Sequence, residues 1–204
     1  MPSRTVEPAA APRPALGEAR ERIFAAAYEL FSTRGIRAVG IDSIIERSGV
    51  ARQTLYRQFD SKQDLVLAFL ERREEVWTRA WLQRAVEQRA DDPVGRLLAV
   101  FDVFDEWFRR PDFEGCAFIN VMLEHTECDD PVRTESTACL ARIREFLAGL
   151  LREAGAADPG ASAREWHILM KGSIVAAGEG DADAARRAQG MGRLLLARDG
   201  LLAA

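Results

Sequence analysis

The amino-acid sequence predicts an all-α protein of about nine helices. Apolar residues recur at three- and four-residue spacing along most of the 204-residue chain, which is the period of an amphipathic helix. Pro and Gly interrupt this pattern at intervals that fit short connections, as at Pro93, Pro131 and Gly155. We find no stretch with the strict alternation of a half-buried strand and therefore expect no sheet.

Composition and charge limit the kinds of protein that this chain can be. It is 48% hydrophobic, enough for one good core or two small ones. Its net charge of -4 is uneven, because residues 1–62 hold ten Lys/Arg against seven Asp/Glu and the remainder holds eighteen against twenty-five. A mildly basic N-terminal part on an acidic body suits a protein that touches nucleic acid at one end only.

Cysteine usage and the N-terminus indicate a cytoplasmic protein. Three cysteines without a C-x-x-C pair favour a reducing compartment over a disulfide scaffold. No apolar run approaches the ~20 residues of a membrane span, and the first residues lack the apolar core of a signal peptide. Residues 1–16 contain four of the eight prolines, so we expect a disordered arm.

The first helix is expected over residues 16–34. Its buried stripe comprises Ile23, Ala27, Leu30 and Phe31, and Gly35 is placed to end it as a C-terminal cap. We expect this helix to brace the segment that follows from behind.

Residues 40–62 show the pattern of two short helices joined by a tight turn. Three isoleucines within residues 41–45 form an apolar stripe, Gly49 supplies the permissive backbone of a sharp turn, and a second helix follows over about 52–59. Two helices set at an angle in this way form a helix-turn-helix, whose second helix can enter a major groove.

The outward face of that second helix suits DNA recognition. Arg can fork onto guanine and Gln onto adenine, while hydroxyl and ammonium groups suit phosphates. The competing interpretation is a pair of core helices with a polar face, because generic helix-turn-helix patterns are weak signals. The outward residues are Arg52, Gln53, Tyr56, Arg57 and Gln58.

This segment resembles the N-terminal domain of the TetR family of transcriptional repressors, AcrR-like members included. The matching stretches are ELFSTRG, SGVARQTLY and QFDSKQDL, and the likeness runs continuously over residues 19–69. The resemblance implies a three-helix DNA-binding domain at residues 17–63 and a helical ligand-binding and dimerisation domain at residues 64–204.

The resemblance also implies roles for single positions. The family's backbone-contacting positions are occupied here by Thr54, Tyr56 and Lys62. Positions that face bases or nearby phosphates are occupied by Arg52, Gln53 and Gln58. Gly40 stands where the family often has a capping Thr that contacts phosphate, and Ala51 where a Ser often caps the recognition helix. Losing such a cap costs about 1 kcal/mol of helix stability.

A long helix is expected from residue 62 into the high 80s. Ser61 and Asp64 resemble a capping box at its start. A helix of ~25 residues is about 40 Å long and can belong to both parts of the chain. In the family that the chain resembles, this helix is the lever between the ligand pocket and the DNA-binding head. Its inner side is expected to carry Leu65, Phe69, Val76 and Leu82.

Five further helices are expected over about residues 93–110, 113–125, 131–154, 162–177 and 181–198, with a loop at 155–161. Aromatic residues at helical spacing fill the first of them, and they fit either a core or a pocket wall; we favour a core, because such stripes usually just pack. The GCAFIN stretch from Gly115 resembles one common in TetR-like regulatory domains. Within it, Asn120 can orient a ligand or satisfy a neighbouring backbone group, and we favour the second.

The resemblance implies a small, mostly apolar effector bound in the C-terminal part. The candidate lining residues are Trp81, Phe101, Phe104, Phe108, Phe118, Met122, His125, Trp166 and Met170. We expect neither metal nor cofactor, because the chain has two histidines and no His/Cys cluster at ligand spacing. Cys116 and Cys128 are expected to be buried or inert thiols rather than a redox switch.

The last two helices are rich in Ala and Gly. Glycine inside a helix costs up to ~1 kcal/mol relative to Ala, so close approach of another backbone is a sensible reason for it; a loosely made C-terminus is the alternative. The resemblance implies pairing with a second copy as a four-helix bundle. The candidate interface residues are Trp166, Met170, Gly172, Ile174, Ala176, Ala177, Met191, Leu194 and Leu195.

Together these features predict a homodimeric repressor that binds a palindromic double-stranded DNA operator and is released by a small molecule. The alternatives are a helical small-molecule-binding enzyme and an adaptor that has lost DNA binding. We expect no enzyme, because the chain lacks a Gly-rich phosphate loop, a nucleophile elbow and a Glu-x-x-His pairing.

Overall fold

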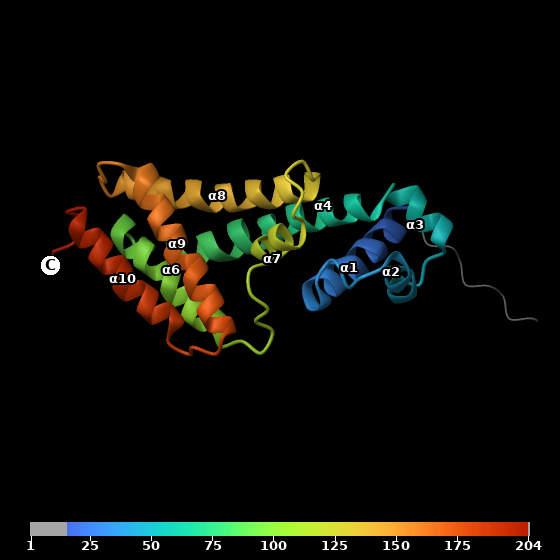
Figure 1. Ribbon diagram of the computed structural model, residues 1–204, viewed down its shortest axis with the longest axis horizontal. Coiled ribbons are helices and arrows are strands. Elements are labelled where there is room, and N and C mark those ends of the chain that lie inside the picture. Colours follow the sequence, from blue (N-terminus) through green and yellow to red (C-terminus); the bar gives the residue numbers. More distant parts are fainter. Residues whose placement is uncertain (1–15, 204) are drawn as a thin grey trace, which may run out of the picture.

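The computed structural model describes residues 16–203, and every regular element in this range is a helix. If the three consecutive segments of the long helix are taken together, the described residues form nine helices (Figure 1). The predicted all-α fold is therefore confirmed. The predicted arm at residues 1–16 lies almost wholly outside the described residues. None of the helices described is long and apolar enough to cross a membrane.

Three helices form a compact unit at one end of the molecule, here called the head. Its core is built from Ile23, Ile44 and Leu55, one from each helix, and each is fully buried. Gly49 ends the second helix with φ +67°, and its N–H donates to the Ile45 carbonyl at 2.9 Å, as the predicted sharp turn requires. The helices are α1 (Leu16–Arg34), α2 (Ile41–Ser48) and α3 (Arg52–Gln58).

A long helix leads from the head into the rest of the molecule, here called the body. It begins with the predicted capping box: Ser61 Oγ accepts from the Asp64 N–H at 3.1 Å, and the Asp64 carboxylate accepts from the Ser61 N–H at 3.0 Å. Its segments are α4 (Lys62–Arg73), the π-helical segment η1 (Glu74–Gln83) and α5 (Arg84–Glu87).

The π-helical segment explains one wrong prediction. Val76 was expected on the inner side, but its side chain is 42% exposed, whereas Glu74 is only 5% exposed. A π-helix bonds residue i to i+5 and is wider than an α-helix, so an apolar stripe counted at 3.6 residues per turn loses phase within it. Leu82, at the far end of the segment, is fully buried as expected.

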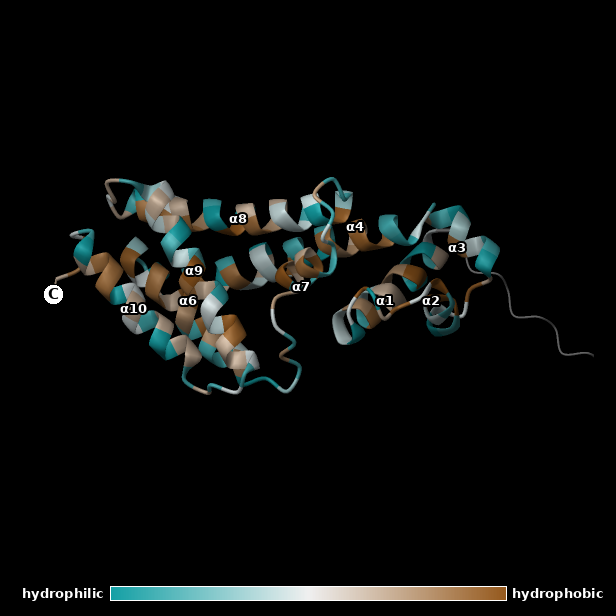
Figure 2. Ribbon diagram, in the orientation of Figure 1, coloured by the Kyte–Doolittle hydropathy of each residue, from teal (hydrophilic) through white to brown (hydrophobic). Residues whose placement is uncertain are grey.

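The remaining helices make up the rest of the body. Three of them, α6, α9 and α10, pack together at the end away from the head (Figure 1). Much of α6 is apolar in Figure 2, and its Phe101 lies 5.6 Å, centroid to centroid, from Trp166 of α9. The helices are α6 (Pro93–Phe108), α7 (Ala117–Glu124), α8 (Pro131–Glu153), α9 (Pro159–Gly178) and α10 (Ala184–Arg198).

The last helix is tied to α6 across a long stretch of sequence. The Gln189 side-chain amide of α10 donates to the Leu98 carbonyl at 3.0 Å and to the Asp102 carboxylate at 2.7 Å. The fold of the body thus depends on contacts between residues that are 91 positions apart in the chain.

Three helix starts differ from expectation. The last helix, expected from about residue 181, begins at Ala184. The other two differences have local reasons. Residues 155–161 were expected to form a loop, but α9 begins at Pro159, because the Asp158 carboxylate accepts from the Ala161 N–H at 2.9 Å and Pro suits the first helical turn. The helix expected from residue 113 begins only at Ala117, because Gly115 has φ +78°, which interrupts a helical path.

Candidate nucleic-acid interface

The recognition helix α3 presents a polar face to solvent. Leu55 is fully buried, whereas Arg52, Gln53, Tyr56 and Arg57 are exposed, and Tyr56 keeps 44% of its surface accessible. The hydropathy colouring of Figure 2 shows α3 as largely hydrophilic. Except for Gln58, which is half-buried, the outward residues predicted from the sequence are therefore exposed to solvent.

Contacts made by two arginines join α3 to the neighbouring helices. Arg20 of α1 donates to the Gln58 carbonyl at 2.5 Å and lies over the Phe59 ring, 4.2 Å from its centroid. At the start of α3, the Arg52 guanidinium pairs with the Asp42 carboxylate of α2. Charged contacts thus position α3, and one of them engages Arg52 of its outward face.

The two unusual caps noted in the sequence are present as expected. Gly40 precedes α2 and Ala51 precedes α3, and neither supplies a side-chain hydrogen bond to the helix that it starts. Both have extended backbone conformations suited to an N-cap. The head therefore forms without these hydroxyl caps.

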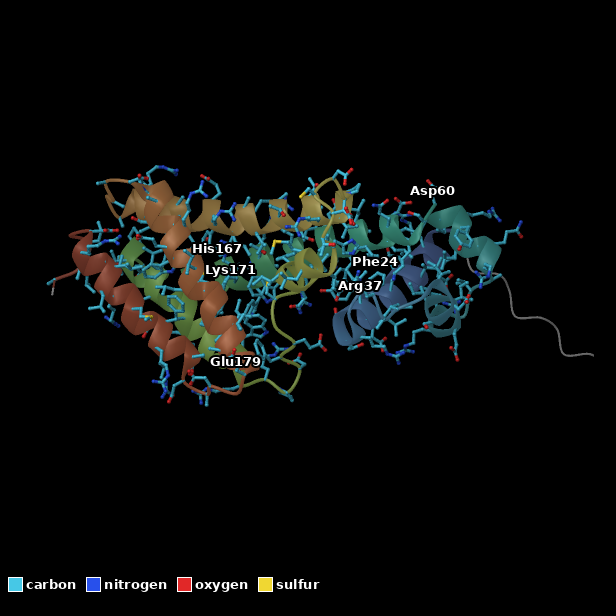
Figure 3. All side chains as sticks on the ribbon, viewed as in Figure 1. Phe24, Arg37, Asp60, His167, Lys171 and Glu179 are labelled. Carbon is cyan, nitrogen blue, oxygen red and sulfur yellow. The ribbon has the colours of Figure 1, made fainter. Side chains whose placement is uncertain are left out.

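Lys62 lies at the junction of head and body. Its ammonium group donates to the Ile36 carbonyl at 2.6 Å, and burial lowers its pKa while the nearby Glu124 carboxylate acts in the opposite direction. Glu124 in turn accepts a hydrogen bond from the Arg37 N–H at 3.0 Å (Figure 3 labels Arg37). A phosphate contact by Lys62 stays a prediction, as do the contacts of half-buried Thr54.

The comparisons with known proteins agree with this geometry. Residues 23–69 match the model described as "Bacterial regulatory proteins, tetR family", and residues 93–191 match "Tetracyclin repressor-like, C-terminal domain". The crystal structure of a TetR-family transcriptional regulator from Streptomyces coelicolor is 30% identical, with a TM-score of 0.81 over 90% of this chain and 96% of that one. The chain belongs to the TetR family.

Other relatives support the same assignment. A putative TetR transcriptional regulator from Streptomyces avermitilis is 27% identical with a TM-score of 0.77, covering 89% of this chain and 98% of that one. The HTH-type transcriptional activator FasR of Mycolicibacterium smegmatis is 30% identical over 132 residues, which span 64% of this chain and 59% of FasR. This TetR-family chain is therefore a helix-turn-helix DNA-binding transcriptional regulator and not an enzyme.

The predicted ligand-contacting residues of this TetR-family regulator fall into separate places. Trp81 lines a groove beside α1, and His125 lines a pocket of about 380 Å³ at the junction of head and body. Phe108 and Met122 are half-buried against the core. The others, Phe101, Phe104, Phe118, Trp166 and Met170, are at most 2% exposed.

Sequence reasoning missed most of the groove beside α1. Tyr28, Arg73, Trp77 and Trp107 line it together with Trp81. The four-residue spacing of Trp77 and Trp81 was the available signal, but the partners come from α1 and α6 and are brought there only by the fold.

His125 and Asn120 are both used in local structure. His125 Nδ1 lies 2.6 Å from the Asp130 carboxylate, and this hydrogen bond lowers the pKa of Asp130. The Asn120 amide donates to the Glu114 carbonyl at 3.3 Å, the backbone role that we favoured. Within residues 16–203 no group of three or more His, Cys, Asp or Glu side chains is arranged to hold a metal ion.

The cysteines differ in their surroundings. Cys116 and Cys139 are buried, and burial raises the pKa of Cys116 and raises that of Cys139 to about 12. Cys128 is exposed, so of the two expected alternatives, a buried or an inert thiol, the first does not apply to it and the second stays a prediction. All three are free thiols.

The predicted interface residues divide into two faces of α9 and α10. Trp166, Met170 and Ile174 are buried in the protomer's own core, so they cannot lie at its surface. Gly172, Met191 and Leu194 are exposed, and Ala176, Ala177 and Leu195 are half-buried. Two further exposed apolar residues of α9 lie outside the predicted set, Ile168 at 63% and Val175 at 54% exposure.

Proposed function

We propose that this regulator is a homodimeric repressor that binds a palindromic operator and releases it when a small, mostly apolar ligand binds the body. The observation that carries the proposal is an apolar surface on the last two helices. Of the seven large hydrophobic side chains that are exposed in the described residues, four lie there, which marks this surface for burial by a partner: Ile168, Val175, Met191 and Leu194.

The surface suits a second copy of the same chain. Ile168, Gly172 and Val175 follow one another at four- and three-residue spacing, so they share one face of α9. The ideal Cβ position at Gly172 has no neighbouring atom within 4 Å, which leaves room for another backbone to approach. A two-fold axis through this face pairs the same helices of both protomers and sets two heads at a fixed spacing.

Polar contacts hold α9 and α10 against each other. Arg198 of α10 bonds the Glu165 carboxylate of α9 at 2.6 Å, and Ser162 of α9 donates to the Asp199 carboxylate at 2.8 Å. These contacts tie the start of α9 to the end of α10, so the two helices meet a partner as one unit.

The route from ligand to DNA runs through the junction of head and body. The Glu124 contact with Arg37 and the contact of Lys62 with the Ile36 carbonyl join the turn after α1 to the body and to the long helix. A ligand that binds one arrangement of this junction better than another shifts the population toward it. If that arrangement misplaces the two heads relative to the half-sites, operator affinity falls.

Activation is the second candidate, and one observation favours it. The relative from Mycolicibacterium smegmatis is named a transcriptional activator, although its match spans 59% of that protein. Transcript levels in a strain lacking the gene separate the two: target transcripts rise if the protein represses and fall if it activates.

The first test is binding to the DNA that flanks the gene. We expect a palindromic footprint, two or more chains per site, and affinity that falls steeply with salt because phosphate contacts release counterions. Gln53→Ala and Tyr56→Ala should lose operator binding while ligand affinity stays intact. A failure to select any sequence from random DNA would contradict the proposal.

The dimer is tested by charge placed on the apolar surface. Leu194→Glu should shift the protein to a monomer in sedimentation and weaken operator binding, because a buried carboxylate without a partner is costly. Leu123→Glu is the matched control, since Leu123 is 65% exposed but lies on α7, away from this surface. Equal effects of both substitutions would count against the proposed interface.

A further inference from the structure

A groove of about 550 Å³ between α1 and the body is lined by three tryptophans. The Trp77 ring lies 5.3 Å from Trp81 and 5.2 Å from Trp107, measured between centroids. Tyr28 of α1 lines the groove from the head. The volume is in the range of small-molecule sites, and indole faces offer flat surfaces on which an aromatic ring can stack.

Two residues that line this groove each have a buried polar atom without a hydrogen-bond partner. Trp77 Nε1 and Ser32 Oγ are buried and without a partner in the structure. Both residues line the groove, Ser32 from α1 and Trp77 from η1. An indole N–H can only donate, so the missing partner of Trp77 is an acceptor atom.

Arg73 adds a positive charge to the same place. It lines the groove together with Trp77, which stands four residues later in the chain. Its guanidinium donates to the Tyr28 hydroxyl at 3.3 Å and makes no ion pair among residues 16–203. The neighbouring Arg110, by contrast, is paired with Asp112 at 2.6 Å.

Most acidic residues of the groove are paired with arginines and so do not cancel the positive charge of Arg73. Asp112 is held by Arg110, and Glu29 is paired with Arg47 of α2 at 2.7 Å. Glu114 remains at the exposed rim, where partial burial raises its pKa and Arg73 acts against that rise. Two of the three carboxylates of the groove are thus paired with arginines, whereas Arg73 has no ion pair among residues 16–203.

We propose that this groove binds a flat aromatic carboxylate. Its rings stack among Trp77, Trp81 and Trp107, and its carboxylate accepts hydrogen bonds from Arg73 and from the Trp77 N–H. Charge-assisted bonds of this kind are the strong ones, and a planar guanidinium matches a carboxylate well.

The position of the groove gives the ligand a regulatory role. Tyr28 and Ser32 belong to the head, whereas Arg73, Trp77 and Trp107 belong to the long helix and the body. A ligand bound between them fixes the head relative to the body. This regulatory role rests on the proposed function; binding to the groove does not.

The binding test uses calorimetry on the full chain. Naphthalene-2-carboxylate is titrated beside two probes that each lack one feature, naphthalen-2-ylmethylammonium with the opposite charge and octanoate without rings. We expect one saturable site for the aromatic carboxylate, at least about tenfold tighter than for either control. Absence of saturable binding at millimolar concentration, or equal binding of the ammonium probe, overturns the proposal.

Substitutions test whether the ligand binds in this groove. Arg73→Gln should weaken binding about tenfold or more, and Trp77→Phe, which keeps a ring but loses the N–H, should weaken it several-fold. Arg84→Gln is the matched control, because Arg84 is an exposed arginine further along the same helix and outside the groove. Circular dichroism confirms that each variant is folded. Undiminished binding by folded Arg73→Gln protein overturns the assignment.

Operator release separates this inference from the proposed function. Release of DNA by naphthalene-2-carboxylate in the wild type but not in Arg73→Gln supports both. Binding without any change in DNA affinity keeps the site and overturns its regulatory role. If the protein binds no operator at all, the proposed function fails, and calorimetry still decides whether the groove takes an aromatic carboxylate.

Discussion

His167 provides a sharp test of the packing inside the body. It lies on α9 (labelled with Lys171 in Figure 3), is 2% exposed, and its Nδ1 has no hydrogen-bond partner. Burial lowers its pKa from 6.5 to about 3, and the positive charges of Lys171 and Arg144 act in the same direction. The imidazole is therefore held neutral in the folded protein.

The sign of the resulting pH dependence follows from the two protonation states. Below the ordinary pKa of 6.5 the unfolded chain takes up a proton at this histidine, while the folded chain does not until the pH nears about 3. Stability is thus lost as the pH falls through this window, by about 1.4 kcal/mol per unit. At about pH 5 the loss from His167 alone is roughly 2 kcal/mol.

The measurement compares three proteins by urea unfolding at about pH 7.5 and pH 5, all at one protein concentration because association shifts apparent stability. The substitution His167→Phe keeps a ring of similar shape without an ionisable group, and it should remove about 2 kcal/mol of the acid-induced loss. The control His125→Gln removes the other histidine and should retain that loss. If His167→Phe loses as much stability as the wild type, the histidine is not buried in its neutral form.

Two further predictions concern helix ends and helix contacts. Ser61→Ala removes the cap on the Asp64 N–H and should lower the free energy of unfolding by about 1 kcal/mol in urea titration; an unchanged midpoint would contradict the capping role. Gly192→Ala places a methyl group 2.7 Å from the Trp166 ring and should cost about 1–3 kcal/mol by thermal melting. The control Gly149→Ala, which meets no atom within 4 Å, should be neutral or stabilising by up to about 1 kcal/mol.

Local signals made the helix-turn-helix and most helix boundaries predictable. Capping residues act within one turn, so Ser61 and the Asp-Pro pairs at Asp92 and Asp130 correctly indicated helix starts. The same Asp-Pro signal occurs at Asp158, but Pro159 was assigned to the loop expected at residues 155–161. The phase error at Val76 has another origin, since nothing in the local sequence indicates a π-helical segment.

The groove and the outer face of α9 depend on tertiary structure, so they were harder to predict from the sequence. Periodicity places Trp166 and Met170 on one apolar face of α9 and Ile168 and Val175 on another, but it does not say which of the two faces the protomer's own core. The tryptophan groove joins α1, η1 and α6, and only the packing of these helices brings their side chains together.

The bond between Gln189 and Leu98 has a consequence for how the chain is made. The head is built from contacts that are local in sequence, so it can fold while the ribosome is still producing the body. The body cannot close in the same way, because α6 waits for α10, which is synthesised about 90 residues later. Until α10 is synthesised, part of the apolar surface of α6 stays exposed to solvent. We therefore expect the head to finish folding before the body does. In chains whose synthesis stalls, we expect chaperones to bind the exposed apolar residues of α6.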